Sequence, residues 1–244
     1  MLKPINLSEF RFQQFTIVQS KNPLKVGTDS MLLGSFIDPT PSEIALDIGA
    51  GTGVLTLMVL QKNPNLIVDA VEIHEDAAAE CAFNVEQSPW QDRVKVHALN
   101  YLEFNPNKQY DLIFSNPPFY LDGLKSGIES IDQAKHISHE MYEHFIRKTA
   151  RLLREDGRFY VIVPWTQLAY LLNLAKDNKL YLQEKITIHA TEEKLNTRVI
   201  LMFTKRNEPI IQSEFTIRLT SGGYTPEYIS LTKQYHATDL TPKH

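Results

Sequence analysis

The sequence predicts an α/β fold, in which a largely parallel sheet carries helices on both faces. Apolar, β-branched runs alternate with amphipathic or Ala-rich segments through the middle of the chain, and this spacing is typical of βαβ units. The expected strands are 15–18, 44–48, 67–73, 94–97, 110–115, 158–163 and 215–219, and the expected helices are 29–36, 54–61, 75–87, 141–154 and 165–178. Two further strand-like runs, 180–190 and 197–204, are joined by a stretch too short for a crossover helix, so we expect them to pair antiparallel.

The two ends of the chain depart from this pattern. Residues 1–42 are polar and irregular, and we expect an N-terminal cap segment there. Residues 43–206 form the expected main domain, and residues 207–244 predict a small C-terminal appendage. The helix of that appendage should begin with Thr225 as its N-cap and Pro226 at its first position.

Composition and charge restrict the class of protein. Of 244 residues, 43% are hydrophobic and 22% are charged, which excludes a disordered chain or a disulfide scaffold. Lys plus Arg number 25 and Asp plus Glu number 29, so the net charge is −4 and any nucleic acid must be held by a local basic patch. The N-terminus lacks the apolar core of a signal peptide, and no apolar run approaches the roughly 18 residues of a membrane span. We therefore expect a cytoplasmic protein of enzyme size that makes no membrane contact.

A glycine-rich loop follows the expected strand 44–48 and opens the next helix. Glycines at this place allow sharp turns and let a ligand approach main-chain N–H groups. A dinucleotide site has the spacing G-x-G-x-x-G, but position 54 is valine. The spacing D-x-G-x-G-x-G instead resembles motif I of class I S-adenosylmethionine (SAM) methyltransferases. The resemblance implies SAM as cofactor, bound by Asp47, Gly49, Gly51 and Gly53.

Two polar residues at later strand ends are candidates for the same ligand. Glu72 stands nineteen residues after Gly53 at the end of a strand, where an acidic side chain can accept hydrogen bonds from both ribose hydroxyls of a nucleoside. Asn100 follows the third strand, where this class of enzyme usually has an aspartate that contacts the adenine amino group. Its amide carbonyl could serve instead, and a purely structural role stays equally open.

The segment Asn116-Pro117-Pro118-Phe119 follows the strand 110–115. It resembles the N-P-P-aromatic motif of methyltransferases that modify an amide or amino nitrogen. The prolines stiffen the turn, so the Asn116 side chain and the Pro117 carbonyl can together accept both hydrogens of a planar –NH2 group. Phe119 supplies a flat face on which a base can stack. The predicted catalytic residues are therefore Asn116, Pro117 and Phe119, with Asn116 also bordering the cofactor.

These segments together resemble the bacterial tRNA1(Val) adenine-N6 methyltransferase family. The resemblance rests on Phe12, Phe15–Gln19, Lys25–Gly34, the glycine loop, Ser88–Trp90 and Asn116–Phe119. It implies a Rossmann-like, seven-stranded mixed sheet whose last strand is antiparallel, with 43–206 as the SAM-dependent methyltransferase domain. It implies methylation of N6 of the adenosine just 3′ of the anticodon, tRNA as partner, and a monomer. The segment Lys25–Asp29, with Lys25 and Thr28 as the candidate contacts, would close the SAM pocket from the N-terminal side; a role as a helix that only covers the sheet stays open.

Alternative functions use related motifs. Glutamine-N5 protein methyltransferases share the N-P-P-aromatic motif but carry a helical domain before the glycine loop, and only 46 residues precede Asp47 here. Ribosomal guanine-N2 methyltransferases often have a histidine after N-P-P-F, where this chain has Tyr120. A non-catalytic RNA-binding module would not need the two motifs together.

Cysteine and histidine usage does not indicate a metal site. The single cysteine, Cys81, can form neither an intramolecular disulfide nor a thiolate zinc site alone, and we expect it in the core. His139-Glu140 and His144 resemble a zincin signature, but the histidines stand one residue too far apart. We expect no metal. His136 remains a candidate to face the substrate pocket.

For RNA contact the sequence offers a few basic residues. The candidates are Lys21, Lys25, Arg147, Lys148, Arg151 and Arg154. The arginines recur at i, i+4 and i+7 on the expected helix 141–154. Such a stripe is more often a solvated face than a nucleic-acid contact, and both interpretations stay open.

Overall fold

The computed structural model describes residues 9–19, 26–117, 131–237 and 240, with the backbone alone over 131–139. The roles expected of Lys21, Lys25, Phe119 and Tyr120, and of the His136 and His139 side chains, lie outside these residues. Thr28, Asn116 and Pro117 lie within them.

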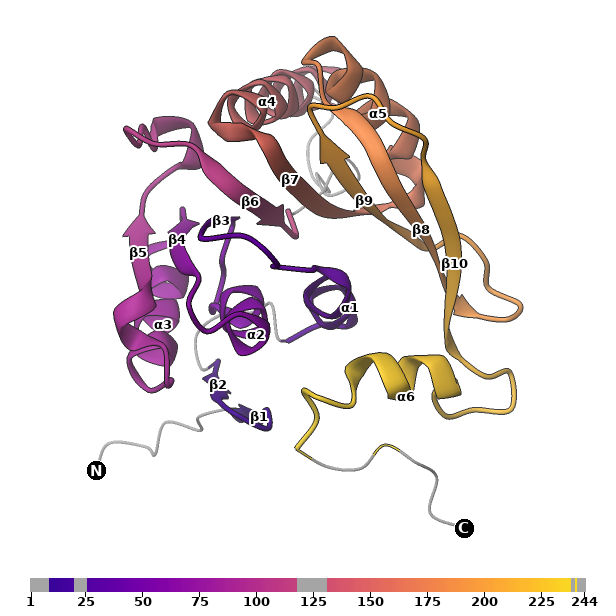
Figure 1. Cartoon of the computed structure of the whole chain (residues 1–244). Helices are drawn as coiled ribbons and strands as arrows, with labels where there is room; N and C mark the ends of the chain where they lie inside the picture. Colours follow the sequence, from indigo (N-terminus) through magenta and orange to yellow (C-terminus); the bar gives the residue numbers. More distant parts are fainter. Residues whose placement is uncertain (1–8, 20–25, 118–130, 238–239, 241–244) are drawn as a thin grey trace.

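The core is an eight-stranded sheet with the order β10-β8-β9-β7-β6-β3-β4-β5 (Figure 1). Its strands are β3 (Ile44–Ile48), β4 (Ile67–Glu72), β5 (Val94–Ala98), β6 (Tyr110–Ser115), β7 (Leu153–Pro164), β8 (Tyr181–Thr191), β9 (Arg198–Thr204) and β10 (Ile211–Arg218). Strands β5, β4, β3, β6 and β7 run parallel, and β9 is antiparallel to both β7 and β8. The predicted α/β class and the antiparallel pairing of the expected strands 180–190 and 197–204 are confirmed.

Helices cover both faces of this sheet. They are α1 (Thr28–Phe36), α2 (Val54–Lys62), α3 (Glu75–Glu86), α4 (Ile131–Leu152), α5 (Leu168–Asp177) and α6 (Pro226–Thr232), with short 3-10 turns η1 (Gln91–Arg93), η2 (Tyr101–Glu103) and η3 (Trp165–Gln167). In β6, Leu112 and Phe114 pack toward α1, α2 and α3, while Ile113 packs toward α4 and α5. This alternation divides the apolar core into two layers, one on each side of the sheet.

The strand count differs from the prediction. The segment expected as a C-terminal appendage contributes β10, an eighth strand that pairs parallel with β8. Residues 211–214 at its start are exposed, so the half-buried alternation that identifies a strand is missing there. The helix after it begins as expected, because the Thr225 side chain accepts a hydrogen bond from the Tyr228 N–H at 3.1 Å.

The N-terminal strands β1 (Glu9–Arg11) and β2 (Thr16–Val18) form a small antiparallel pair outside the main sheet. Ile17 of this pair packs in the core, and a buried side chain of α3 adds hydrogen bonds to the pair. Asn84 of α3 accepts a hydrogen bond from the Val18 N–H at 2.8 Å and donates to the carbonyls of Val18 and Thr52 at 3.0 and 2.9 Å. Because Thr52 lies in the glycine loop, the N-terminal pair is joined directly to that loop.

A partly buried lysine holds helix α1 at its C-terminal end. Lys62 of α2 donates hydrogen bonds to the carbonyls of Ser35 and Ile37 at 2.5 and 2.6 Å. These carbonyls end α1 and have no intrahelical partner, so the ammonium group satisfies them and complements the helix dipole. Burial lowers the Lys62 pKa to about 8, and nearby Asp38 opposes that shift. Lys62 thus fixes the position of α1 against α2.

We expect Lys62→Met to lower the free energy of unfolding by roughly 1.5–3 kcal/mol, because two helix-terminal carbonyls lose a charged donor. The Lys62 pKa is lower in the folded protein than its ordinary 10.5, so the unfolded chain binds more protons between these values. The wild type should therefore gain stability over the variant as the pH rises from about 8 to 10.5. Urea unfolding at several pH values measures both effects. Lys176→Met, at an exposed helix end, is the control; an equal loss there would contradict this role of Lys62.

Candidate active site

The glycine loop connects β3 to α2, and three of its residues have left-handed backbone geometry. Gly49, Gly51 and Gly53 have φ values of 73°, 56° and 86°, which side-chain-bearing residues rarely adopt. A Cβ at Gly53 would lie 3.0 Å from the Cys81 sulfur, whereas a Cβ at Gly49 would meet no atom within 4 Å. The loop is thus packed against α3 at one glycine and open at another. Cys81 is buried, as predicted.

Glu72 at the end of β4 lies beside this loop. One carboxylate oxygen accepts a hydrogen bond from the Gly51 N–H at 2.8 Å, and the other accepts from the His74 N–H at 2.9 Å. The side chain is therefore held in place, and only 5% of the residue is exposed. Each carboxylate oxygen keeps lone-pair capacity for a further donor, such as a ribose hydroxyl.

Asp47 is fully buried below the same loop. Its Oδ2 accepts a hydrogen bond from the Thr56 hydroxyl at 2.6 Å, and its Oδ1 has no hydrogen-bond partner among the residues that the structure describes. Burial raises the Asp47 pKa to about 7, and the negative charge of Glu72 contributes to the same shift. An unpaired acidic oxygen and the fixed Glu72 carboxylate suit a ligand with cationic and hydroxyl groups. SAM carries both, so these residues fit the cofactor that the motif implied.

Asn100 follows β5 at the same edge of the sheet. Its side-chain oxygen accepts a hydrogen bond from the Leu102 N–H at 2.9 Å and so caps η2. One lone pair of the oxygen expected to contact adenine is therefore already in use, and one remains.

Asn116 and Pro117 directly follow β6, next to the glycine loop. The Ser115 hydroxyl donates to the Ile48 carbonyl at 2.7 Å, which ties the end of β6 to the end of β3. The Asn116 side-chain amide donates to the Ser30 hydroxyl oxygen of α1 at 3.1 Å. The structure thus places the two described residues of the N-P-P-F segment beside the loop, as the order of the parallel strands requires.

Two further residues of α1 take part in this arrangement: Asp29, which belongs to the segment Lys25–Asp29 expected to close the SAM pocket, and Ser30, which the sequence did not indicate. Ser30 contacts Asn116, and Asp29 forms an ion pair with Arg198 of β9 at 2.9 Å. Thr28, expected to border the cofactor, is the first residue of α1 and is exposed. Asp29 and Ser30 belong to the segment Lys25–Gly34, on which the family resemblance rested. Membership of that segment is the sequence feature that could have indicated a role for Ser30 in the site.

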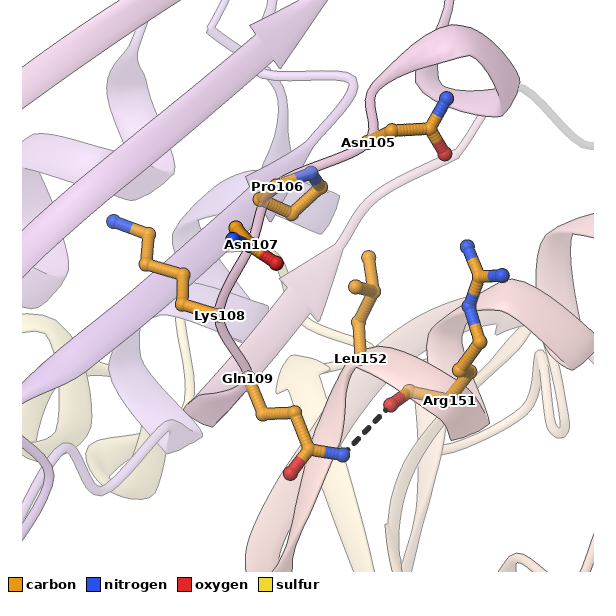
Figure 2. Close-up of a pocket in the computed structure, with 7 residues that line it drawn as sticks. All are labelled: Asn105, Pro106, Asn107, Lys108, Gln109, Arg151 and Leu152. Carbon is orange, nitrogen blue, oxygen red and sulfur yellow. Dashed lines mark hydrogen bonds between the residues drawn. The ribbon is translucent and has the colours of Figure 1, made fainter.

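The pocket in Figure 2 lies at the opposite end of β6 and is separate from this site. It has a volume of about 460 Å³ and is lined by residues 105–109 with Arg151 and Leu152. Lys108 points away from Arg151 (Figure 2) and forms an ion pair with Asp69 at 2.7 Å. The glycine loop and Asn116 lie at the carboxyl edge, whereas this pocket lies at the amino edge.

The basic stripe expected on the helix 141–154 is not one surface. Lys148 is only 8% exposed and donates to the Leu102 carbonyl at 2.9 Å. Arg154 lies in β7, where it forms an ion pair with Asp111 at 2.5 Å. Arg147 and Arg151 remain exposed. The prediction of a continuous stripe was wrong, because the helix ends at Leu152 and Lys148 turns inward.

The described part of the chain contains no group of three or more side chains placed to hold a metal ion. Within the same residues, no helix combines the length and apolar character that crossing a membrane requires.

Comparison with known proteins places the chain among methyltransferases. The family model "Methyltransferase small domain" matches residues 9–177. A tRNA1(Val) (adenine(37)-N6)-methyltransferase from Flavobacterium johnsoniae is 39% identical over 232 residues, covering 93% of this chain and 98% of the relative. One from Bacteroides thetaiotaomicron is 32% identical over 228 residues, covering 93% and 96%.

Solved structures show the same fold at low sequence identity. A predicted O-methyltransferase from Agrobacterium tumefaciens superposes with a TM-score of 0.66 at 17% identity, covering 85% of this chain and 96% of that one. TYW2 from P. horikoshii, solved in complex with MeSAdo, gives a TM-score of 0.58 at 13% identity, covering 83% and 73%.

The doubly wound sheet and the loop at its carboxyl edge define a class I methyltransferase, as the sequence predicted. More narrowly, the chain belongs to the tRNA1(Val) (adenine(37)-N6)-methyltransferase family. The family expected from the sequence motifs is therefore confirmed.

Asp47 gives the site a testable pH dependence. Its pKa is raised from 3.8 to about 7 in the folded protein, so the folded state binds more protons across that window and loses stability as the pH rises through it. Asp47→Asn removes this loss. The variant should be more stable than the wild type by roughly 2–4 kcal/mol at about pH 8, and the difference should shrink toward about pH 4.

Denaturant unfolding across the pH range measures this difference. Asp156→Asn, at an exposed position in β7, is the control and should change stability by about 0.5 kcal/mol or less. If Asp47→Asn were less stable than the wild type at every pH, the buried Asp47 carboxylate would not destabilise the folded protein, and this explanation would be wrong.

Proposed function

We propose that this protein transfers a methyl group from SAM to N6 of adenine 37 in tRNA1(Val). The observation that carries the proposal is the position of Asn116 and Pro117 at the carboxyl edge, beside the loop of Gly49 to Gly53. The names of its relatives supply the substrate, since each is a tRNA1(Val) (adenine(37)-N6)-methyltransferase.

The cofactor role rests on the residues around the glycine loop. In this proposal Glu72 accepts hydrogen bonds from the ribose hydroxyls, and Asp47 with the loop glycines receives the amino-acid end. Asn100 contacts the adenine through its remaining lone pair, and Lys25 and Thr28 close the site from the N-terminal side. SAM, when bound, supplies the methyl group on a positively charged sulfur.

The Asn116 oxygen and the Pro117 carbonyl act on the nitrogen that receives the methyl group. An exocyclic amino nitrogen is a poor nucleophile, because its lone pair is delocalised into the ring. Two fixed acceptors draw its hydrogens out of the ring plane and stabilise the positive charge that develops on the nitrogen. After the transfer the positively charged nitrogen loses one N–H proton to water, and neither residue forms a covalent bond to the substrate.

An anticodon-loop adenine suits this site. A loop base is partly unstacked already, so turning it into the site costs less than the few kcal/mol needed to extract a base from a duplex. We propose that Phe119 stacks on this base. Because the net charge of the protein is −4, a limited basic patch must hold the tRNA. Few phosphate contacts then form, so the salt dependence of tRNA binding should be shallow.

We expect Asn116→Ala to lower the single-turnover rate by about 10²–10³, by analogy with the loss of one oxyanion-hole donor. Its affinity for SAM should stay nearly unchanged, because the lost oxygen acts on charge that develops in the transition state. Rapid-quench assays and calorimetry measure the two quantities. Asn107→Ala, in the lining of the separate pocket drawn in Figure 2, is the control. A wild-type rate in Asn116→Ala would refute the amino-nitrogen mechanism.

The substrate is tested by incubating the purified protein and methyl-labelled SAM with three acceptors. These are unmodified tRNA1(Val), the same tRNA with guanine at position 37, and a release-factor peptide that contains glutamine. We expect label on the adenine-containing tRNA alone, recovered as N6-methyladenosine. Label on the peptide and on neither tRNA would indicate glutamine methylation, and label recovered as methylguanosine would indicate a guanine-N2 enzyme.

A further inference from the structure

Within the described residues, one hydrogen bond joins helix α1 to Asn116 of the N-P-P-F segment. The Asn116 side-chain nitrogen donates to the Ser30 hydroxyl oxygen at 3.1 Å, between residues 86 positions apart in the chain. Both residues are partly buried. The contact therefore lies beside the reacting region and is not a solvated surface pair.

This contact affects which atom of the Asn116 amide can face the substrate. Asn116 has one oxygen, which accepts hydrogen bonds, and one nitrogen, which donates them. The proposed reaction needs the oxygen toward the substrate amino group, because a nitrogen there would set donor against donor. With its nitrogen donating to Ser30, the amide oxygen is the atom left to accept, and within the described residues no donor occupies it.

Ser30 itself is held on a helix fixed at both ends. Next to it, Asp29 forms the ion pair with Arg198 of β9, and at the far end Lys62 binds the carbonyls of Ser35 and Ile37. The hydroxyl of Ser30 is thus presented from a rigid element, which limits how far Asn116 can rotate.

We propose that Ser30 is a positioning residue, which sets the orientation of the Asn116 amide for transfer to the amino nitrogen. This inference rests on the proposed function and adds to it a residue outside both sequence motifs. Its effect is exerted through Asn116, so it should change the rate of the methyl-transfer step and leave the binding of SAM and tRNA largely unaltered.

The test compares Ser30→Ala, Ser30→Thr and Ser35→Ala. Ser35 lies on the same helix, is 6% exposed, and its hydroxyl has no hydrogen-bond partner within the described residues, so its removal controls for loss of a serine from α1. Ser30→Ala should lower the single-turnover rate about tenfold. The partly buried side-chain nitrogen of Asn116 then has no acceptor on α1, and the Asn116 amide can rotate. Ser30→Thr, which keeps the hydroxyl, should restore most of the rate, and Ser35→Ala should match the wild type.

Dissociation constants for SAM and tRNA and the unfolding temperature separate positioning from a structural effect. They should stay close to wild type in Ser30→Ala. In the Asn116→Ala background, Ser30→Ala should cause no further loss, because the residue through which it acts is gone. A parallel fall in rate, affinity and unfolding temperature, or equal losses in Ser30→Ala and Ser35→Ala, would overturn the inference. If Asn116→Ala itself kept the wild-type rate, the proposed function would fail and not only the role of Ser30.

Discussion

Parallel pairing of β3 with β4 and β6 is the constraint on which the site depends. The register sets Ile48 opposite Val71 and Ser115, so all three strands end at one edge of the sheet. The residues that follow these ends are the glycine loop, Glu72 and Asn116. Because side chains alternate between faces, a slip of one residue in any strand would turn its buried set to the wrong side. The same pairing that builds the core therefore brings the candidate cofactor and acceptor residues together.

That edge also concentrates negative charge out of water. Asp47 and Glu72 are both buried beside the glycine loop, and the Asp47 pKa is raised to about 7 as a result. A protein selected for stability alone would gain by removing such a carboxylate. A binding site for a cationic cofactor explains why the carboxylate is kept, because positive charge on the ligand offsets the desolvation free energy of the two buried acids. The family membership and the electrostatics of the glycine loop thus both support a binding site for a cationic cofactor at this edge.

Local patterns made much of this architecture predictable from the sequence. The glycine loop and the N-P-P-F segment each follow a strand whose apolar run is evident, and helix starts such as Thr225-Pro226 carry their own capping signal. The sequence did not predict contacts that depend on distant packing. The inward turn of Lys148 requires the Leu102 carbonyl, and the Ser30–Asn116 bond spans 86 positions. The strand expected at 215–219 begins earlier, at Ile211, over residues that are polar and exposed, and α4 begins at Ile131, well before the expected start at 141.

The function proposed for this chain is the methylation of one adenine in one tRNA. The most direct test is mass spectrometry of nucleosides and of nuclease fragments from the tRNA of cells with and without the gene. N6-methyladenosine should disappear from position 37 of tRNA1(Val) in the deletion strain. The wild-type gene, but not one encoding Asn116→Ala, should restore the modification to its normal level. An unchanged level of N6-methyladenosine at that position in the deletion strain would contradict the proposed function.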